Sequence, residues 1–358
     1  MPDLDAPTSF ARLDPQGMLA CIADLPRQCE VAWEKVQSVD LPDEYRDVDQ
    51  IVILGMGGSA IGGDLLRALL IAESPIPIIV HRDYGLPAFA DERTLVIACS
   101  YSGNTEETLG GFESAVQREA RVVSITTGGE LERRTRERGL PLCLYHYRSQ
   151  PRAALGYSLT LLLGIVQRLG LIEDKSADVG QAASVMRYWQ QEIAPSVPTG
   201  ENAAKQLAHR LFRRLPVVYA AEHLSEVARR WKGQFNENAK SWGVFDVLPE
   251  LNHNSVVGYP SPHDLRQLAH VIMLTSTLNH PRVRLRFDIT RELLERHGFA
   301  WESVDARGSS PLAQVLSTIH FGDFVSYYLA MLYEVDPWSI GSIDLVKARL
   351  RPSSDAQS

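Results

Sequence analysis

Glycine and serine cluster at one place in the sequence where a backbone could bind an anion. Residues 55–64 read Gly-Met-Gly-Gly-Ser-Ala-Ile-Gly-Gly-Asp and directly follow Ile51–Leu54, an apolar run typical of a buried strand. Glycines let backbone N–H groups approach an anion, and a helix that starts there adds partial positive charge. Gly57, Gly58 and Ser59 are therefore candidate phosphate ligands.

A second segment, residues 100–108, is richer in hydroxyls. It reads Ser-Tyr-Ser-Gly-Asn-Thr-Glu-Glu-Thr, so Ser100, Ser102 and Thr105 lie within six residues of one another at the predicted start of a helix. It follows the apolar strand predicted at 94–98. Because ligands bind beyond the carboxyl ends of parallel strands, the two loops are expected to face one pocket.

Simpler interpretations of the two loops remain open. Both could be tight strand-to-helix turns in which serine and threonine cap the helix. The first loop is not a dinucleotide fingerprint, because no acidic residue closes the following strand, Ile76–Val80. A Walker A loop is excluded, because neither Gly-Lys-Ser nor Gly-Lys-Thr occurs in the sequence. The Ser-x-Ser-Gly-Asn-Thr pattern is the more specific of the two.

Strand and helix patterns alternate through the first half of the chain. Short apolar strands separated by helices predict a parallel sheet with both faces covered. An amphipathic helical segment precedes it at residues 1–48. The expected strands span residues 51–54, 76–80, 94–98, 122–126 and 140–145.

The alternation resumes after a Pro- and Gly-containing stretch, Pro195–Gly200, which predicts a linker. The second half is expected to hold strands 216–221, 270–275 and 300–305, with long helices 225–241 and 311–333. The fold class is therefore α/β. Two domains are predicted, one at residues 1–194 with an N-terminal helical extension and one at residues 201–358.

Composition narrows the class of protein. The chain has 358 residues, 45% of them hydrophobic, and a net charge of −8, which argues against nucleic-acid and anionic-membrane binding. The four cysteines show no CxxC spacing and the histidines no metal-ligand cluster, so a reduced compartment and no metal are expected. The chain shows neither a signal peptide pattern nor 18 consecutive apolar residues. We therefore expect a cytoplasmic protein.

Motifs scattered from residue 55 to residue 347 resemble a known enzyme family. The first half resembles a sugar isomerase (SIS) domain. The segments Gln150–Tyr157, Trp231–Lys240, Pro249–Asn254 and Ile343–Lys347 resemble the bifunctional phosphoglucose/phosphomannose isomerases. The resemblance implies two SIS-type domains, each a parallel sheet flanked by helices. It also implies interconversion of glucose 6-phosphate, and of mannose 6-phosphate, with fructose 6-phosphate in glycolysis and gluconeogenesis.

The resemblance also implies roles for particular residues. Glu237 corresponds to the isomerisation base and Arg152 to a cation near the developing enediolate. His253 and Lys347 correspond to groups that assist at the sugar-ring oxygens, and the histidine acts in the neighbouring subunit's site, which implies a homodimer. The implied phosphate ligands are Gly57, Gly58, Ser59, Ser100, Ser102 and Thr105.

The residue types suit this chemistry. One carboxylate on one face of a cis-enediol can both remove and return the proton, and partial burial would make it basic enough near neutral pH. Ring opening needs a separate acid and base, for which a histidine titrates in the right range. A fixed arginine would stabilise the oxyanion. No metal or cofactor is needed for these steps.

Each catalytic assignment has a plainer alternative. On the predicted helix 225–241, Glu237 falls on the polar side, where it could be a solvated carboxylate paired with Lys240. Gly233, one turn earlier, indicates that a ligand or another backbone approaches this face closely. His253 could be a hydrogen-bonding turn residue and Lys347 a solvated one, while Arg152 could merely cap the helix that starts beside it.

Two segments depart from the family pattern. Residues 220–223, Ala-Ala-Glu-His, lack the expected glycine or serine, so only one phosphate site is predicted. Residues 336–342 are bulkier than expected and leave acceptance of mannose 6-phosphate open. The alternative functions are a non-catalytic phosphosugar-binding protein and an isomerase or transferase of amino-sugar phosphates. A transferase would need a glutaminase domain with a cysteine nucleophile at its N-terminus, and the sequence reads Met1-Pro2 there.

Overall fold

Five parallel strands form the first sheet. The computed structural model describes residues 3–6 and 10–350, and its first sheet has the order β2-β1-β3-β4-β5. The central pair, β1 and β3, is almost completely buried, as expected for short apolar strands covered on both faces. The strands are β1 (Gln50–Leu54), β2 (Ile78–His81), β3 (Thr94–Ser100), β4 (Arg121–Thr126) and β5 (Leu142–Leu144), and the helices between them are α4 (Gly57–Leu70), α5 (Glu106–Gln117) and α6 (Gly129–Glu137).

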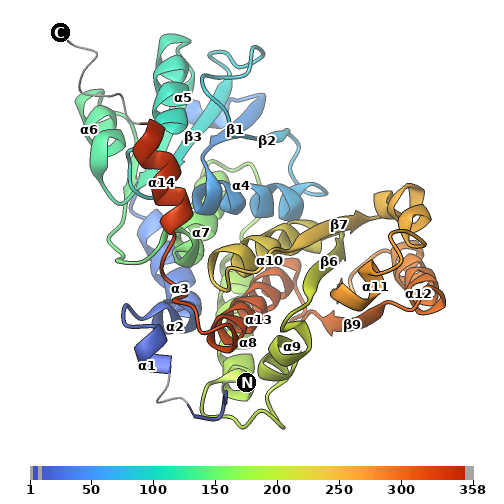
Figure 1. Ribbon diagram of the computed structural model, residues 1–358. Helices are drawn as coiled ribbons and strands as arrows, with labels where there is room; N and C mark the ends of the chain where they lie inside the picture. Colours follow the sequence, from blue (N-terminus) through green and yellow to red (C-terminus); the bar gives the residue numbers. More distant parts are fainter. Residues whose placement is uncertain (1–2, 7–9, 351–358) are drawn as a thin grey trace.

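Four parallel strands form the second sheet, in the order β7-β6-β8-β9 (Figure 1). The edge strand β7 was not predicted from the sequence, because Asp246 interrupts its apolar run and only Leu248 is buried. The strands are β6 (Leu215–Ala221), β7 (Val244–Leu248), β8 (Ala269–Thr275) and β9 (Ala300–Asp305). The helices between them are α10 (Ser225–Glu237), α11 (Leu265–Leu268) and α12 (Pro281–Arg296). The predicted class, two parallel sheets flanked by helices, is confirmed.

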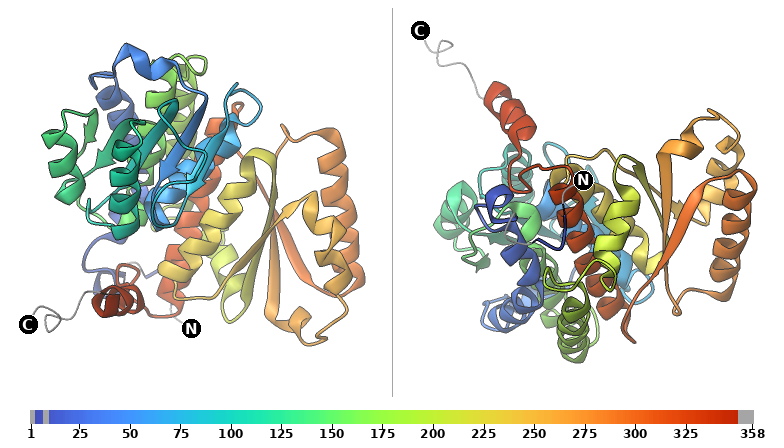
Figure 2. Two further views of the ribbon diagram at one scale, coloured as in Figure 1. Left: turned by 90° about the horizontal axis from the view of Figure 1, so that it is seen from above. Right: turned by 60° about the horizontal axis from the view of Figure 1, so that its bottom comes forward.

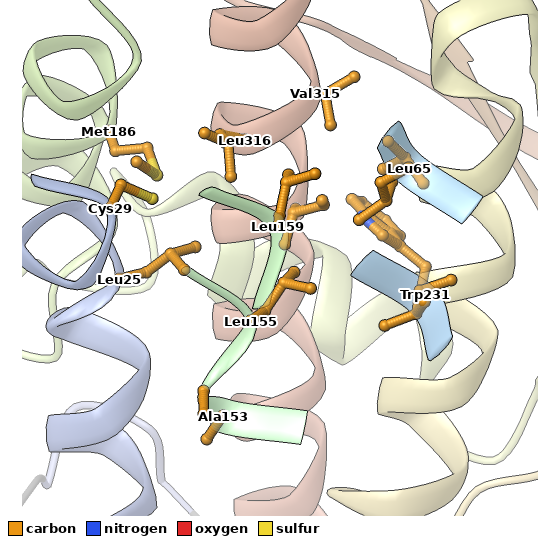
Figure 3. Packing of buried hydrophobic residues seen from close by; sticks show 14 of the residues in the cluster. Leu25, Cys29, Leu65, Ala153, Leu155, Leu159, Met186, Trp231, Val315 and Leu316 are labelled. Atoms are coloured by element: carbon orange, nitrogen blue, oxygen red, sulfur yellow. The ribbon is translucent and has the colours of Figure 1, made fainter. Parts of the chain in front are cut away.

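Helices from both halves pack into one continuous core (Figure 3). Leu65 of α4 and Trp231 of α10 lie together in it beside Val315, although they belong to different halves of the chain. The remaining helices are α1 (Phe10–Leu13), α2 (Met18–Ala23), α3 (Leu25–Val36), α7 (Leu155–Arg168), α8 (Ser176–Ile193), α9 (Ala203–Leu211), α13 (Pro311–Leu332) and α14 (Gly341–Leu350). By length and composition α13 could cross a membrane, but its apolar stretch is entirely buried inside the protein.

The stretch between α8 and α9 is held in place by a buried lysine. Lys205 Nζ donates hydrogen bonds to the carbonyl oxygens of Pro195 and Val197, both at 2.8 Å, and lies 3.0 Å from the carboxylate of Asp5. The lysine side chain is fully buried, so a charge removed from water is compensated by these acceptors. The connection between the two halves is therefore fixed.

The last described helix is the exception to this packing. All ten residues of α14 are exposed, among them the apolar Leu345 and Val346. Figure 2 shows the helix projecting away from the body of the molecule. A short helix without a buried face gains little from packing, so α14 is the least supported helix of this chain.

Candidate active site

The two predicted phosphate loops lie side by side. They follow β1 and β3, which are adjacent in the sheet, with Leu54 opposite Ala98. The backbone N–H of Tyr101 donates a hydrogen bond of 3.2 Å to Ser59 Oγ, which joins the loops directly. The helices α4 and α5 begin there, so both N-terminal partial charges face the same edge of the sheet.

The hydroxyls of the second loop differ in exposure. Ser100 is buried, and its Oγ lies 2.9 Å from Thr105 Oγ1. Ser102 is exposed and accepts a hydrogen bond of 3.2 Å from the backbone N–H of Asn104. Thr105 immediately precedes α5. Ser102 and Thr105 are therefore the hydroxyls best placed to meet an incoming anion, while Ser100 orients Thr105.

A glycine of the first loop makes room for protein. A Cβ added at Gly58 would lie 2.8 Å from the backbone nitrogen of Arg152 and from the carbonyl carbon of Pro151. Gly57, beside it, has a φ of +49°, a conformation that favours glycine. These glycines were predicted to admit an anion, but Gly58 also allows the backbone of residues 151–152 to pack against the loop.

The segment that leads to Arg152 is tied to the second loop by one side chain. Tyr101 Oη lies 2.5 Å from the carbonyl oxygen of Tyr147 and 2.9 Å from that of Ser149, and it accepts a hydrogen bond of 2.9 Å from the N–H of Ser149. The position of the arginine therefore depends on both phosphate loops.

Arg152 joins the two halves of the molecule. It lies in the short 3-10 helix Pro151–Ala153, and its side chain is almost completely buried. Nη1 lies 3.4 Å from Oε2 of Glu237. Desolvation lowers the pKa of the guanidinium, and the carboxylate of Glu237 opposes this shift. The arginine does more than cap a helix, because its charged end reaches α10.

Glu237 is the last residue of α10. The predicted core stripe of this helix is confirmed, because Val227, Ala228, Trp231 and Phe235 are all buried. The side chain of Glu237 is 31% exposed, so its carboxylate is open to a ligand while it lies against Arg152.

The ion pair between the Glu237 carboxylate and Lys240, the plainer alternative for this residue, does not form. Lys240 Nζ donates to the backbone carbonyl of Glu237 at 2.8 Å and to that of Asp336 at 2.6 Å, but not to the carboxylate. Although Lys240 is exposed, desolvation beside Arg152 lowers its pKa to about 8. Its φ of +53° is unusual for a residue with a side chain and places the ammonium over the end of α10.

Part of the polar side of α10 is buried, whereas Glu237 on the same side stays 31% exposed. Arg230 and Gln234 are buried, and both bond to the buried carboxylate of Asp323 on α13, at 3.1 Å and 2.8 Å. Burial raises the pKa of Asp323, and the charge of Arg230 opposes this shift. Gly233 faces open space, with nothing within 4 Å of an added Cβ, so the close protein neighbour that it suggested is absent among the described residues.

His253 and Lys347 are not brought to Glu237 within this chain. Glu237 ends the helix that returns to the amino end of β7, whereas His253 follows the carboxyl end of that strand (Figure 1). Five strand residues separate these ends by about 16 Å. His253 is exposed and Lys347 lies on the exposed α14, and neither side chain makes a hydrogen bond or ion pair within residues 3–6 and 10–350.

The corresponding loop of the second sheet is occupied by a side chain of the protein. Glu222 follows β6 with a φ of +51°, and its carboxylate accepts hydrogen bonds from Asn279 Nδ2 at 2.6 Å and from the N–H of His280 at 3.1 Å. His280 precedes α12, so this carboxylate sits where an anion would meet the helix N-terminus. That the protein has a single phosphate site stays a prediction.

Sequence reasoning missed Asn238, Arg230 and Asp323 as parts of the site. Asp323 lies about ninety positions from its partners, so no local spacing could have signalled the contact. In the described part of the chain, no group of three or more His, Cys, Asp and Glu side chains is arranged to hold a metal ion.

Comparisons with known proteins match this architecture. Residues 44–138 match the SIS domain model, and residues 200–350 match the bacterial phospho-glucose isomerase C-terminal SIS domain model. The bifunctional phosphoglucose/phosphomannose isomerase of Caldicellulosiruptor bescii is 41% identical over 94% of this chain and all of its own length. That of Aquifex aeolicus is 36% identical, over 89% of this chain and 94% of its own. A hypothetical protein of Thermus thermophilus, 20% identical, superposes with a TM-score of 0.73 over 96% of this chain and 93% of its own.

Proposed function

The chain belongs to the bifunctional phosphoglucose/phosphomannose isomerase family, and from this premise we propose that it interconverts glucose 6-phosphate and mannose 6-phosphate with fructose 6-phosphate. The observation that carries the proposal is the contact of Arg152 with Glu237 across the two halves of the molecule, 3.4 Å between Nη1 and Oε2. Arg152 also packs on Gly58, so the anion-binding edge and the carboxylate are joined through one residue.

The phosphate of the sugar binds at the carboxyl edge of the first sheet. Backbone N–H groups at Gly57 and Gly58, with the hydroxyls of Ser59, Ser102 and Thr105, supply donors, and the N-termini of α4 and α5 add partial positive charge. Ser100 supports Thr105 through their contact of 2.9 Å. The sugar chain then extends from this edge towards the end of α10.

Glu237 transfers the proton. In the direction from fructose 6-phosphate, its carboxylate removes a proton from carbon 1 of the open-chain sugar to give a cis-enediolate. The hydroxyl proton on O1 moves to O2, and Glu237 returns its proton to carbon 2 to give the aldose. The negative charge that develops on the oxygens is stabilised by the buried guanidinium of Arg152. Neither step transfers an electron to a cofactor, and we propose that no metal is required.

His253 and Lys347 act on the sugar-ring oxygens in this proposal. Because His253 follows the far end of β7 from Glu237, we propose that a second copy supplies it and that the active form is a homodimer. Lys347 requires α14 to move towards the body of the molecule or a partner. The two domains, residues 1–194 and 201–358, would then each contribute one part of a cytoplasmic enzyme of glycolysis and gluconeogenesis.

A non-catalytic phosphosugar-binding role fits less well. A binding protein needs the hydroxyl loop but has no need of a carboxylate paired with a buried arginine at the end of α10. Burying a charge is costly unless it is compensated, so this pair is expected to serve a reaction.

The test is a coupled assay with glucose 6-phosphate and with mannose 6-phosphate, with and without a chelator, on the wild type and on Glu237→Gln. We expect the variant to lose about 10³-fold in kcat, because the amide cannot accept the proton. Glu137→Gln is the matched control, since Glu137 also ends a helix and also pairs with an arginine, Arg133. It should keep full activity. Normal turnover by Glu237→Gln would remove the proposed base, and loss of wild-type activity with chelator would refute the metal-free mechanism.

A further inference from the structure

One fully buried amide lies directly behind the arginine of the site. Asn238 follows the last residue of α10, and its side-chain oxygen accepts a hydrogen bond of 2.8 Å from Nε of Arg152. Its Nδ2 donates a bond of 3.0 Å to Ser326 Oγ, which in turn donates to the carbonyl oxygen of Asp323 at 2.8 Å. Both ends of the amide are engaged, so its orientation is fixed.

The other hydrogen bonds of Arg152 engage Nη2 and leave Nη1 to face Glu237. Nη2 donates to the carbonyl oxygens of Pro337 at 2.6 Å and Trp338 at 3.1 Å. A guanidinium has five N–H groups, and those of Nε and Nη2 are thus directed at protein acceptors. Nη1 is the nitrogen that lies 3.4 Å from the carboxylate of Glu237.

The backbone of the arginine is held by the same network. Arg230 Nη2 donates a bond of 2.7 Å to the carbonyl oxygen of Arg152 and also pairs with the carboxylate of Asp323. Arg230 and Asp323 are both buried. Because Asp323 and Ser326 lie on α13, the largest helix of the shared core orients both the main chain and the guanidinium of Arg152.

We propose that Asn238 is a positioning residue of the isomerase site, which fixes the rotation of the Arg152 guanidinium so that Nη1 meets Glu237 and the oxyanion of the enediolate. The inference rests on the proposed function, because it assigns a task to Arg152 in that reaction. Asn238 itself is buried behind the arginine and needs no contact with the substrate. Ser326 is the support that keeps the amide from turning over.

Asn238→Ala and Asn238→Asp test this role together. The alanine variant should lose about 10- to 100-fold in kcat with KM changed less than about threefold, because the guanidinium turns away from the charge that develops in the transition state. Asn238→Asp keeps an acceptor for Nε and should recover part of kcat. Its added carboxylate competes for Arg152, so the acid limb of the kcat/KM profile should move to higher pH. Ser326→Ala should show a smaller loss of the same kind, about threefold.

Asn202→Ala is the matched control. Asn202 is also fully buried, but its Oδ1 caps α9 through the N–H of Lys205 and its Nδ2 bonds to the carbonyl oxygen of Ala194. It should lower the melting temperature without changing the pH profile or KM.

Wild-type kcat and pH profile in folded Asn238→Ala, or an equal kcat loss in Asn202→Ala, would overturn the proposal. If Asn238→Ala does not fold, Asn238→Asp and Ser326→Ala decide it by the same two readouts. An inactive Glu237→Gln beside an unaffected Asn238→Ala would refute this inference alone, whereas an active Glu237→Gln would refute the proposed function.

Discussion

The two sheets of this protein present the same kind of strand–helix unit but use opposite ends of it. At the first sheet, neither Met56 nor Thr105 makes a side-chain cap for α4 or α5, and the first turns carry glycines and hydroxyls. At the second sheet, the equivalent position is filled by the carboxylate of Glu222, which bonds to Asn279 and to the N–H of His280. The second half instead offers the C-terminal end of α10, where Glu237 lies.

In the proposed function, this difference divides binding from chemistry between the two ends. A helix N-terminus attracts an anion, whereas a base at a C-terminus is surrounded by backbone carbonyls and needs a cation beside it. Arg152, which comes from the first half of the chain, supplies that cation. The candidate site therefore lies at the contact between the two halves of the chain. Substitutions at this contact should have the largest effect on activity.

The largest effect in this comparison is expected from Gly58→Ala. An added Cβ would meet backbone atoms of Pro151 and Arg152 at 2.8 Å, so one of the two segments must shift. We expect about 1–3 kcal/mol lower stability and, from displacement of the arginine, about 100-fold lower kcat. Chemical denaturation and steady-state kinetics measure both.

Gly233→Ala, in the second half of the chain, provides the contrast to Gly58→Ala. It lies one turn before Glu237 in a helix and faces open space. Alanine there should raise stability by about 1 kcal/mol and leave kcat unchanged. If the two glycine variants behaved alike, close packing of the loop on residues 151–152 would not explain the effect.

A smaller effect, on binding, is expected from Ser102→Ala. Loss of one hydroxyl donor to the phosphate should raise KM about tenfold with little change in kcat. Glu222→Gln makes the parallel change at the second sheet, where no substrate is expected. Its KM should equal that of the wild type. A raised KM in Glu222→Gln would indicate that both sheets bind the sugar phosphate.

The smallest effect concerns Lys240, which covers the end of α10. Since desolvation lowers its pKa to about 8, the ammonium loses its proton as the pH rises through that value. The contacts with the carbonyls of Glu237 and Asp336 then weaken, and activity should fall about threefold.

Stability should change in the opposite direction over the same range. The unfolded chain holds the lysine proton up to a higher pH, so the free energy of unfolding should rise slightly above pH 8. Lys240→Arg stays charged and should abolish the alkaline fall in activity. An unchanged alkaline limb in this variant would assign it to another group.

The sequence predicted the parts of the fold that depend on local pattern. Strand Ala300–Asp305 and the core stripe of α10 follow directly from apolar spacing. Strand β7 was missed because Asp246 interrupts its apolar run, and its place in the sheet comes from pairing with β6 and packing against α10. Helix α12 is capped by His280, and the N–H of His280 bonds to Glu222, a long-range contact that sequence spacing does not reveal.

The candidate site could be predicted only in part. The types and spacing of Ser100, Ser102 and Thr105 indicated an anion loop, and the loops do lie together. The burial of Arg230 and Gln234 on the polar side of α10 could not be predicted, because their partner Asp323 lies on α13 and sequence spacing carries no information about it. Contacts with distant parts of the chain therefore decide whether a polar residue of a helix is buried or solvated.

The most direct test of the division between the sheets is the affinity for fructose 6-phosphate, measured by calorimetry on Glu237→Gln and on Ser102→Ala. We expect Glu237→Gln, although inactive, to bind the sugar with a Kd within about threefold of wild-type KM. Ser102→Ala should bind it about tenfold more weakly while retaining turnover at saturation. The reverse pattern, weak binding by Glu237→Gln and normal binding by Ser102→Ala, would contradict it.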